Sequence, residues 1–229
     1  MPKYVQITFC LLFALSALAQ QKEVDRLKAT YSVLKEILDM PDKGIPRDLL
    51  DKAECVVVYP SVLKAAFIVG GSYGRGVITC RTGKNFEGPW SAPAMFALEG
   101  GSVGLQIGGE ATDFVLLVMN EKDAESVMSS KVKLGADASA AAGPVGRTAS
   151  AETDVVMKAE ILSWSRARGV FAGISLAGST MRSDNDGNKH LYGKELSAKE
   201  IVREGKVKTP DAGKSLVGLL EKVSPKHIS

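Results

Sequence analysis

The chain has 229 residues, 45% of them hydrophobic, and a formal net charge of +3. This length and composition predict one globular domain with a sizeable buried core. The positive charge is not concentrated in any block, which excludes the strongly basic surface typical of nucleic-acid-binding proteins. We therefore expect no nucleic-acid partner.

The first 19 residues have the pattern of a secretory signal peptide. Lys3 supplies the positive start, residues 5–15 the apolar core, and Ala17-Leu18-Ala19 the A-x-A cleavage site. The apolar stretch is shorter than a membrane-spanning helix prefers, although an uncleaved anchor is the alternative. We expect export, with the mature chain, residues 20–229, in the periplasm or secreted, including at the periphery of a membrane.

An amphipathic helix is predicted in the N-terminal segment at residues 20–44. Its apolar positions step by three and four, as on one face of a helix, and they are Val24, Leu27, Tyr31, Leu34 and Leu38. The opposite face mixes both signs of charge, unlike the strongly cationic face of a membrane-surface helix. This mixture favours packing of the stripe on the core, and docking of the stripe on a membrane is the alternative.

A glycine-rich sheet is predicted for the middle of the chain, after a short helix at residues 47–53. The β-prone runs are residues 55–59, 64–69, 73–80, 94–98, 103–107 and 114–119. Glycine pairs at 70–71, 100–101 and 108–109 indicate turns between them. Glycine repeated this often also marks bulges, bends and close backbone approach. The pattern predicts a strongly curved, barrel-like, mainly antiparallel sheet.

Helices and further strands are predicted for the remainder. They are a helix at 121–129, strands at 157–164 and 170–176, a turn at 184–188 and an amphipathic helix at 211–223. Residues 131–142 fit either a strand or a helix. Ser197 and Glu200 form a capping box that opens another helix. The predicted fold class is α+β, with a core domain at 45–193, a C-terminal helical extension at 194–229, and N- and C-terminal helices packed on the sheet.

Two cysteines remain after the predicted cleavage, Cys55 and Cys80. An oxidising compartment permits a disulfide between them. However, Cys55 begins one predicted strand and Cys80 ends another two strands later. A disulfide needs Cα atoms within about 7 Å, so this arrangement favours two buried thiols over a bridge.

Motifs for catalysis or metal binding are weak in this sequence. G-x-S-x-G occurs at residues 70–74 and 100–104, but neither match has the strand-then-helix setting of a serine-hydrolase nucleophile elbow. A set of Ser72, Asp184 and His190 is the remaining hydrolase alternative. Two histidines and two cysteines at these spacings match no zinc site. We expect no enzymatic activity, no cofactor and no metal.

Four basic residues stand beside glycines at predicted strand ends or turns: Lys64, Arg75, Arg166 and Arg168. If these turns meet on one rim of the sheet, the four side chains and glycine-exposed backbone N–H groups form an anion-binding surface. Ordinary solvated surface charges are the alternative.

Nine short phrases occur in an order that resembles the SYLF domain. They are KAAF at 64–67, GG at 70–71, GRG at 74–76, WSAP at 90–93, GLQIG at 104–108, VMN at 118–120, KLGADAS at 133–139, GPVGR at 143–147 and GVFAG at 169–173. The resemblance covers about residues 45–193, and it points to the secreted, single-domain, bacterial type of member.

The resemblance implies a non-catalytic, lipid-binding module. Eukaryotic members carry an SH3 or FYVE module, bind phosphoinositides and, in fungi, bind actin, and an amphipathic N-terminal segment helps them dock on membranes. For an exported single domain the implied ligand is an anionic phospholipid membrane surface, and actin is not an expected partner. The alternative is a structural or protein-interaction module of the cell envelope that binds an envelope protein and no lipid.

Overall fold

A computed structural model describes residues 3–40, 44–66, 69–103, 108–145, 158–167 and 170–227. Its strands are β1 (Cys55–Ala66), β2 (Val69–Cys80), β3 (Ala94–Val103), β4 (Gly108–Val118), β5 (Val132–Lys133), β6 (Ala140–Ala142), β7 (Ile161–Ala167), β8 (Val170–Gly173) and β9 (Ser179–Ser183). They form one sheet in the order β5-β9-β3-β2-β1-β4-β7-β6, and β8 pairs with β7. The described pairings are antiparallel except that of β6 with β7.

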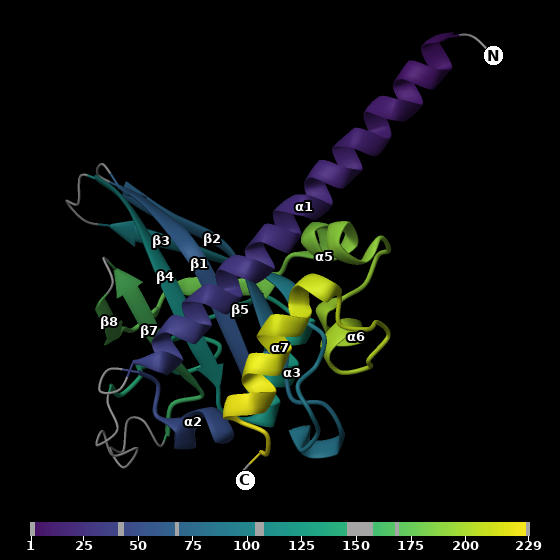
Figure 1. Ribbon diagram of the computed structural model, residues 1–229. Coiled ribbons are helices and arrows are strands. Elements are labelled where there is room, and N and C mark those ends of the chain that lie inside the picture. Colours follow the sequence, from purple (N-terminus) through teal and green to yellow (C-terminus); the bar gives the residue numbers. More distant parts are fainter. Residues whose placement is uncertain are drawn as a thin grey trace.

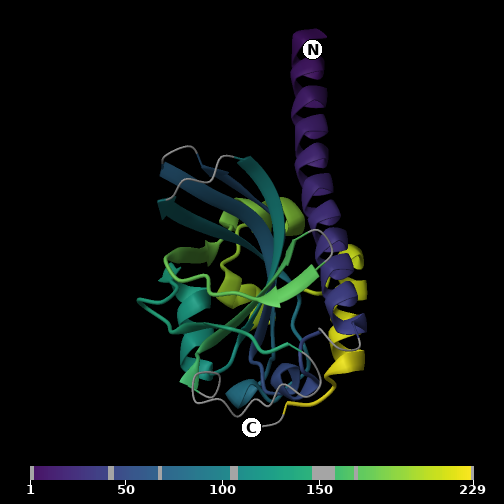
Figure 2. The ribbon, with the colours of Figure 1, turned by 90° about the vertical axis from the view of Figure 1, so that its left-hand side faces the viewer.

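Helices cover both faces of this curled sheet (Figures 1 and 2). They are α1 (Lys3–Asp39), α2 (Arg47–Asp51), α3 (Glu121–Ser129), α5 (Asn185–Tyr192), α6 (Ala198–Val202) and α7 (Asp211–Val223), and a 3-10 turn spans Lys84–Phe86. Helices α1, α2 and α7 pack on one face, and α3 and α6 pack on the other. This α+β half-barrel with N- and C-terminal helices confirms the predicted fold class.

Each face of the sheet has its own buried hydrophobic cluster. Phe114 and Val115 are neighbours in β4, yet Phe114 belongs to the cluster under α3 and α6, and Val115 to the cluster under α1, α2 and α7. Side chains alternate between the two faces of a strand. Apolar runs without alternation, as at 55–59, therefore arise because helices cover both faces of the sheet.

The glycine pairs do not lie at turns. Gly70 and Gly71 are inside β2, where they pair with Ala66 and Ala65 of β1. The pairs at 100–101 and 108–109 likewise lie inside β3 and β4. The predicted turns were wrong because the glycines continue the strands into the curved end of the sheet. The connections at 67–68 and 104–107 are outside the described residues.

A β-bulge interrupts the pairing of β1 with β2 between Val58 and Leu63. Ser61, inside the bulge, has a φ of 55°. A Cβ added to Gly76 in β2 would stand 2.1 Å from the carbonyl oxygen of Val58. Glycine is required at position 76 because the two backbones approach too closely for any side chain, which is the role predicted for glycines in this sheet.

A disulfide joins Cys55 and Cys80, with Cα atoms 4.0 Å apart. The prediction of two buried thiols was wrong. Run 55–59 and residues 64–66 of the next run belong to one long strand, β1, whereas Val69 already begins β2. The antiparallel neighbour β2 ends opposite the point where β1 begins. The first residue of β1 therefore pairs directly with the last residue of β2.

The C-terminal part departs from the predictions at two places. The predicted turn at 184–188 is wrong because Asp184 caps helix α5, accepting the backbone N–H of Gly187 at 3.1 Å. Residues 131–142 contain the short strands β5 and β6 rather than one strand or helix. The capping box of Ser197 and Glu200 opens α6 as predicted, and α7 has the predicted bounds. The part of the predicted strand 157–164 before residue 158 is outside the described residues.

Candidate functional site

The four basic residues predicted to bind lipid are placed on different strands. Arg75 is in β2 and Arg166 in β7, two strands separated by β1 and β4. Lys64 is in β1, between Ser72 of β2 and Glu110 of β4, and Arg168 is outside the described residues. Anion binding by this set remains a prediction, and the structure supplies partners for two of its members.

Arg75 fastens the start of the packed part of α1 to the sheet. Its Nε and Nη2 each lie 2.6 Å from Oδ2 of Asp184, and its Nη1 lies 3.8 Å from Oε1 of Glu23 in α1. Arg26, one turn further along α1, pairs with Glu23 and reaches Asp184 at 3.8 Å. Two guanidinium groups and two carboxylates therefore meet where α1, β2 and the start of α5 converge.

Burial dominates the electrostatics of this cluster. It raises the pKa of the Glu23 carboxyl, and the positive charges of Arg26 and Arg75 oppose that rise. It also lowers the pKa of Arg26, whose charge Glu23 supports. A buried charge is costly unless it is paired, so each member of the cluster depends on the others.

Arg166 fastens the other end of α1 in the same way. Its Nε lies 2.6 Å from Oδ2 of Asp113 in β4, and its Nη1 pairs with Glu36 near the end of α1. Burial raises the pKa of Asp113, and the N–H bond from Ser61 opposes the rise. We call the Arg75–Glu23 and Arg166–Glu36 contacts the two arginine clamps.

The apolar stripe predicted for the N-terminal helix packs on the core. Leu27 and Leu34 are fully buried, and Val24, Tyr31 and Leu38 are half-buried. The buried face also includes Val33 and Ile37, so it is rotated slightly from the predicted stripe. Packing on the core is the arrangement that the sequence favours. Docking of this stripe on a membrane remains a prediction that would require α1 to leave the core.

A different apolar surface is exposed. Leu63 in β1 is 63% exposed and Tyr73 in β2 is 48% exposed, and the two are direct cross-strand partners. Val62 belongs to the cluster under α3 and α6, so Leu63 and Tyr73 point to the face that carries α1. Ala111 of β4, the other partner of Leu63, is exposed as well. We call Leu63, Tyr73 and Ala111 the open face.

A buried polar cluster ties the end of α7 to the opposite end of the sheet. Arg81 is fully buried; its Nη2 donates to the carbonyl oxygen of Ser224 at 2.8 Å, and its guanidinium lies 4.2 Å from the centre of the Trp90 ring. Nε2 of His227 lies 3.5 Å from Oε2 of Glu54, which is 5% exposed. Burial, helped by Glu121, raises the pKa of Glu54 from 4.5 to about 7.

The raised pKa predicts a pH-dependent stability that Glu54→Gln should remove. Glu54 binds its proton more tightly in the folded chain, so its contribution is complete below pH 4.5 and is lost as pH rises through about 7. At pH 8 the variant should exceed the wild type in unfolding free energy by on the order of 2 kcal/mol. Denaturant unfolding at pH 8 and pH 4.5 measures the difference, which should vanish at the lower pH. Glu87→Gln, at an exposed carboxylate, is the control; a variant less stable than wild type at pH 8 would contradict the prediction.

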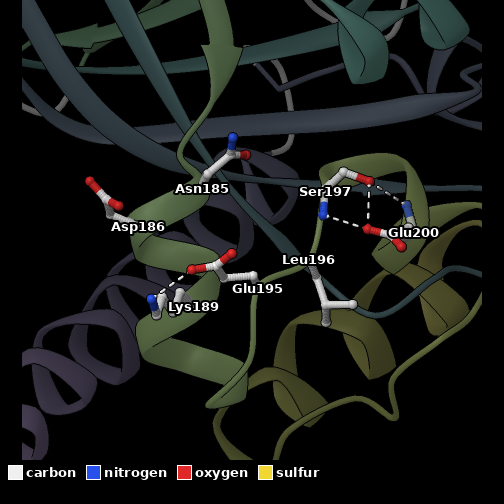
Figure 3. A pocket seen from close by; sticks show the side chains of 7 residues that line it. All are labelled: Asn185, Asp186, Lys189, Glu195, Leu196, Ser197 and Glu200. Atoms are coloured by element: carbon white, nitrogen blue, oxygen red, sulfur yellow. Dashed lines mark hydrogen bonds and ion pairs between the residues drawn. The ribbon is translucent and has the colours of Figure 1, made fainter.

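A hollow of about 290 Å³ lies between α5 and α6 (Figure 3). Its lining residues are Asn185, Asp186, Lys189, Glu195, Leu196, Ser197 and Glu200. Several of its polar groups bond within the protein: Lys189 pairs with Glu195 at 2.7 Å, and hydrogen bonds from Lys206 and then Ser197 lower the pKa of Glu200 to about 2. This internal pairing stabilises the α5–α6 connection and gives no indication of a ligand.

The hydrolase alternative gains no support. The Asp184 carboxylate is held by Arg75 and Gly187, and among the described hydrogen bonds and ion pairs none joins Ser72, Asp184 and His190. No three His, Cys, Asp or Glu side chains of the described residues are arranged to hold a metal ion. Among the helices that the structure describes, none has the length and apolar character needed to cross a membrane.

The described residues thus define a curled-sheet domain with helices on both faces. Its distinctive feature is an exposed apolar surface, the open face, which lies beside Arg75 of one arginine clamp. Known proteins are similar to this chain in sequence. The Ysc84 family model, described as Las17-binding protein actin regulator, matches residues 99–223. LAS seventeen-binding protein 3 of Saccharomyces cerevisiae is 35% identical over 184 residues, which cover 79% of this chain and 39% of that protein.

Two further relatives indicate the same family. Protein YSC84 of the same yeast is 36% identical over 185 residues, 79% of this chain and 38% of that protein. SH3 domain-containing YSC84-like protein 1 of Xenopus laevis is 32% identical over 189 residues, 82% of this chain and 55% of that protein. The chain belongs to the Ysc84 family, whose shared domain is the SYLF domain. It spans less than two thirds of the length of each of these relatives.

Proposed function

We propose that this chain binds anionic phospholipid at a membrane surface without catalysing a reaction. The observation that carries the proposal is the open face, where Leu63 and Tyr73 stand side by side, exposed to solvent, on the central strands of the sheet. Membership of the SYLF family, with its expected lipid binding, supports the same conclusion.

The charge of the chain makes such an apolar contribution necessary. Each basic residue near an anionic membrane contributes about 1 kcal/mol, and the formal net charge is only +3. Full burial of a large apolar side chain contributes about 1.5–3 kcal/mol. Partial insertion of an exposed apolar surface, added to attraction by basic side chains, is therefore the physical basis of the proposed binding.

We further propose that residues 1–19 direct export and are removed. Among the described side chains of α1, the first buried one is Glu23. Cleavage after Ala19 would therefore remove no side chain that the structure describes as buried, so it is compatible with the fold. The mature chain would then meet anionic phospholipid at an envelope membrane.

Co-sedimentation tests the proposed function. Residues 20–229 are mixed with vesicles that contain or lack anionic phospholipid, at low and high salt. The proposal expects binding to anionic vesicles that weakens as salt screens the charges. The absence of binding to anionic vesicles at low salt would overturn it.

Binding to a protein is the second candidate function. The matched family model is described as an actin regulator that binds Las17, and LAS seventeen-binding protein 3 is among the relatives. For an exported chain, the corresponding partner would be a protein of the cell envelope. Co-sedimentation with actin filaments, run beside the vesicle experiment, tests the partner that the description of the family model names. Binding to filaments in the absence of lipid would favour this second candidate.

A further inference from the structure

We infer that the open face, Leu63, Tyr73 and Ala111, is the surface that docks on the membrane, while α1 stays packed on the sheet. The inference rests on the proposed function and names the part of the molecule that performs it. It differs from docking through the N-terminal amphipathic helix, because it assigns the membrane contact to the sheet.

Exposure of large hydrophobic side chains is rare in the described part of this chain. It is confined to Leu18, Leu63, Tyr73 and Val145. Leu63 and Tyr73 are cross-strand neighbours, so they form one continuous apolar surface. Exposed hydrophobic residues that stand singly need no explanation, whereas a contiguous group marks a surface that contacts another molecule.

The arrangement of charges beside the open face favours an anionic partner. Arg75 lies two residues from Tyr73 in β2, and so on the same face. Its side chain is 31% exposed, whereas those of its partners Glu23 and Asp184 are 1% and 8% exposed. The guanidinium therefore faces solvent and the carboxylates lie beneath it. Glu99, the partner of Tyr73 on β3, is 40% exposed and is paired with Arg182, which is 30% exposed. The exposed charge of this pair is balanced, so the exposed guanidinium of Arg75 leaves the described surroundings of Tyr73 positive on balance.

The position of α1 agrees with this orientation. The N-terminal half of α1 and the far end of the β1–β2 hairpin project at the same end of the molecule in both views (Figures 1 and 2). A membrane that contacts the open face would therefore lie at the end of the molecule toward which residues 3–19 project before their removal.

Three buried side chains and the two arginine clamps keep α1 in place. Leu27, Leu34 and Ile37 are fully buried against the sheet. Their release would expose them and would also separate Glu23 from Arg75 and Glu36 from Arg166. The open face needs no such rearrangement, because it is already exposed in the packed chain.

The test compares vesicle affinities of variants of residues 20–229. Leu63→Ala/Tyr73→Ala should weaken binding to anionic vesicles by about tenfold or more, because it removes most of the apolar area of the open face. Val145→Ala, an exposed hydrophobic residue outside the open face, should leave the affinity unchanged. Equal affinity of the double variant and the wild type would overturn the inference and leave the proposed function intact, whereas failure of the wild type to bind would overturn the proposed function itself.

A spectroscopic measurement keeps the inference testable if the double variant folds poorly. The native Trp90 and Trp164 are 4% and 0% exposed, so vesicles of brominated anionic lipid should not quench their fluorescence. Tyr73→Trp in the full chain should add fluorescence that those vesicles quench. Vesicle binding of this variant without quenching would overturn the inference.

Discussion

Gly76→Ala should destabilise the fold by about 3 kcal/mol. The added Cβ would stand 2.1 Å from the carbonyl oxygen of Val58 and 2.5 Å from Cδ1 of Tyr59. Tyr59 is fully buried, and the Val58 carbonyl belongs to the neighbouring strand, so neither can move without disturbing the bulge in β1. The free energy of unfolding of residues 20–229, from denaturant titration, measures the effect.

Gly218→Ala is the matched control for this prediction. Gly218 is exposed in α7, and a Cβ there would have no atom within 4 Å. Alanine has a higher helix propensity than glycine, so this change should stabilise the fold by about 0.5–1 kcal/mol. Equal unfolding free energies for Gly76→Ala and the wild type would show that the backbones at the bulge are not closely packed.

Loss of the disulfide is the second large effect that we expect. Cys55→Ala/Cys80→Ala should lower the free energy of unfolding by about 3–4 kcal/mol. The bridge joins residues 25 apart in the sequence, and it restricts the unfolded chain between them. Denaturant titration of residues 20–229, which lack Cys10, measures this difference without a third thiol.

A reducing agent supplies the control for the disulfide. It should destabilise the wild type by a similar amount and leave the double variant unchanged, because only the wild type has a bond to reduce. A wild type whose stability does not respond to full reduction would contradict the prediction. It would then follow that pairing between β1 and β2 fixes this end of the sheet without the bond.

The fold class is readable in the sequence, while the lengths of the strands are not. Apolar runs on both sides of repeated glycines indicate a curved sheet, and helical periodicity locates α1, α3 and α7. The glycine pairs at 70–71 and 100–101 misplace the turns, because glycine is typical of turns as well as of strongly bent strands. The two long strands β1 and β2, and the disulfide at their ends, were missed for that reason.

The open face was missed because of one extra residue. Val57 and Tyr59 face the cluster under α3 and α6, and strict alternation would place Leu63 on the same side. The bulge in β1 reverses the alternation, so Val62 is buried and Leu63 is exposed. Pro60, directly after the β-prone run 55–59, is the signal available in the sequence, because proline inside a sheet is typical of edges and bulges.

The arginine clamps could not be predicted from local sequence. Arg75 and Asp184 are 109 residues apart, and Arg166 and Glu36 are 130 residues apart. The contact of Arg75 with Asp184 depends on where α5 begins, and the two clamps depend on the path of α1 across β2, β1, β4 and β7. The pattern of basic residues beside glycines identifies Arg75 and Arg166 as notable, but it contains no information about their acidic partners.

Hydrogen exchange of the vesicle-bound chain, followed by mass spectrometry, tests most directly the claim that the sheet docks while α1 stays packed. Residues 20–229 are compared free and bound to anionic vesicles. The account predicts slower exchange at the open face, in the parts of β1 and β2 around Leu63 and Tyr73, and unchanged exchange in α1 from Glu23 to Asp39. Faster exchange in α1, with no change around Leu63 and Tyr73, would contradict it, because the helix would then have left the sheet to bind the membrane.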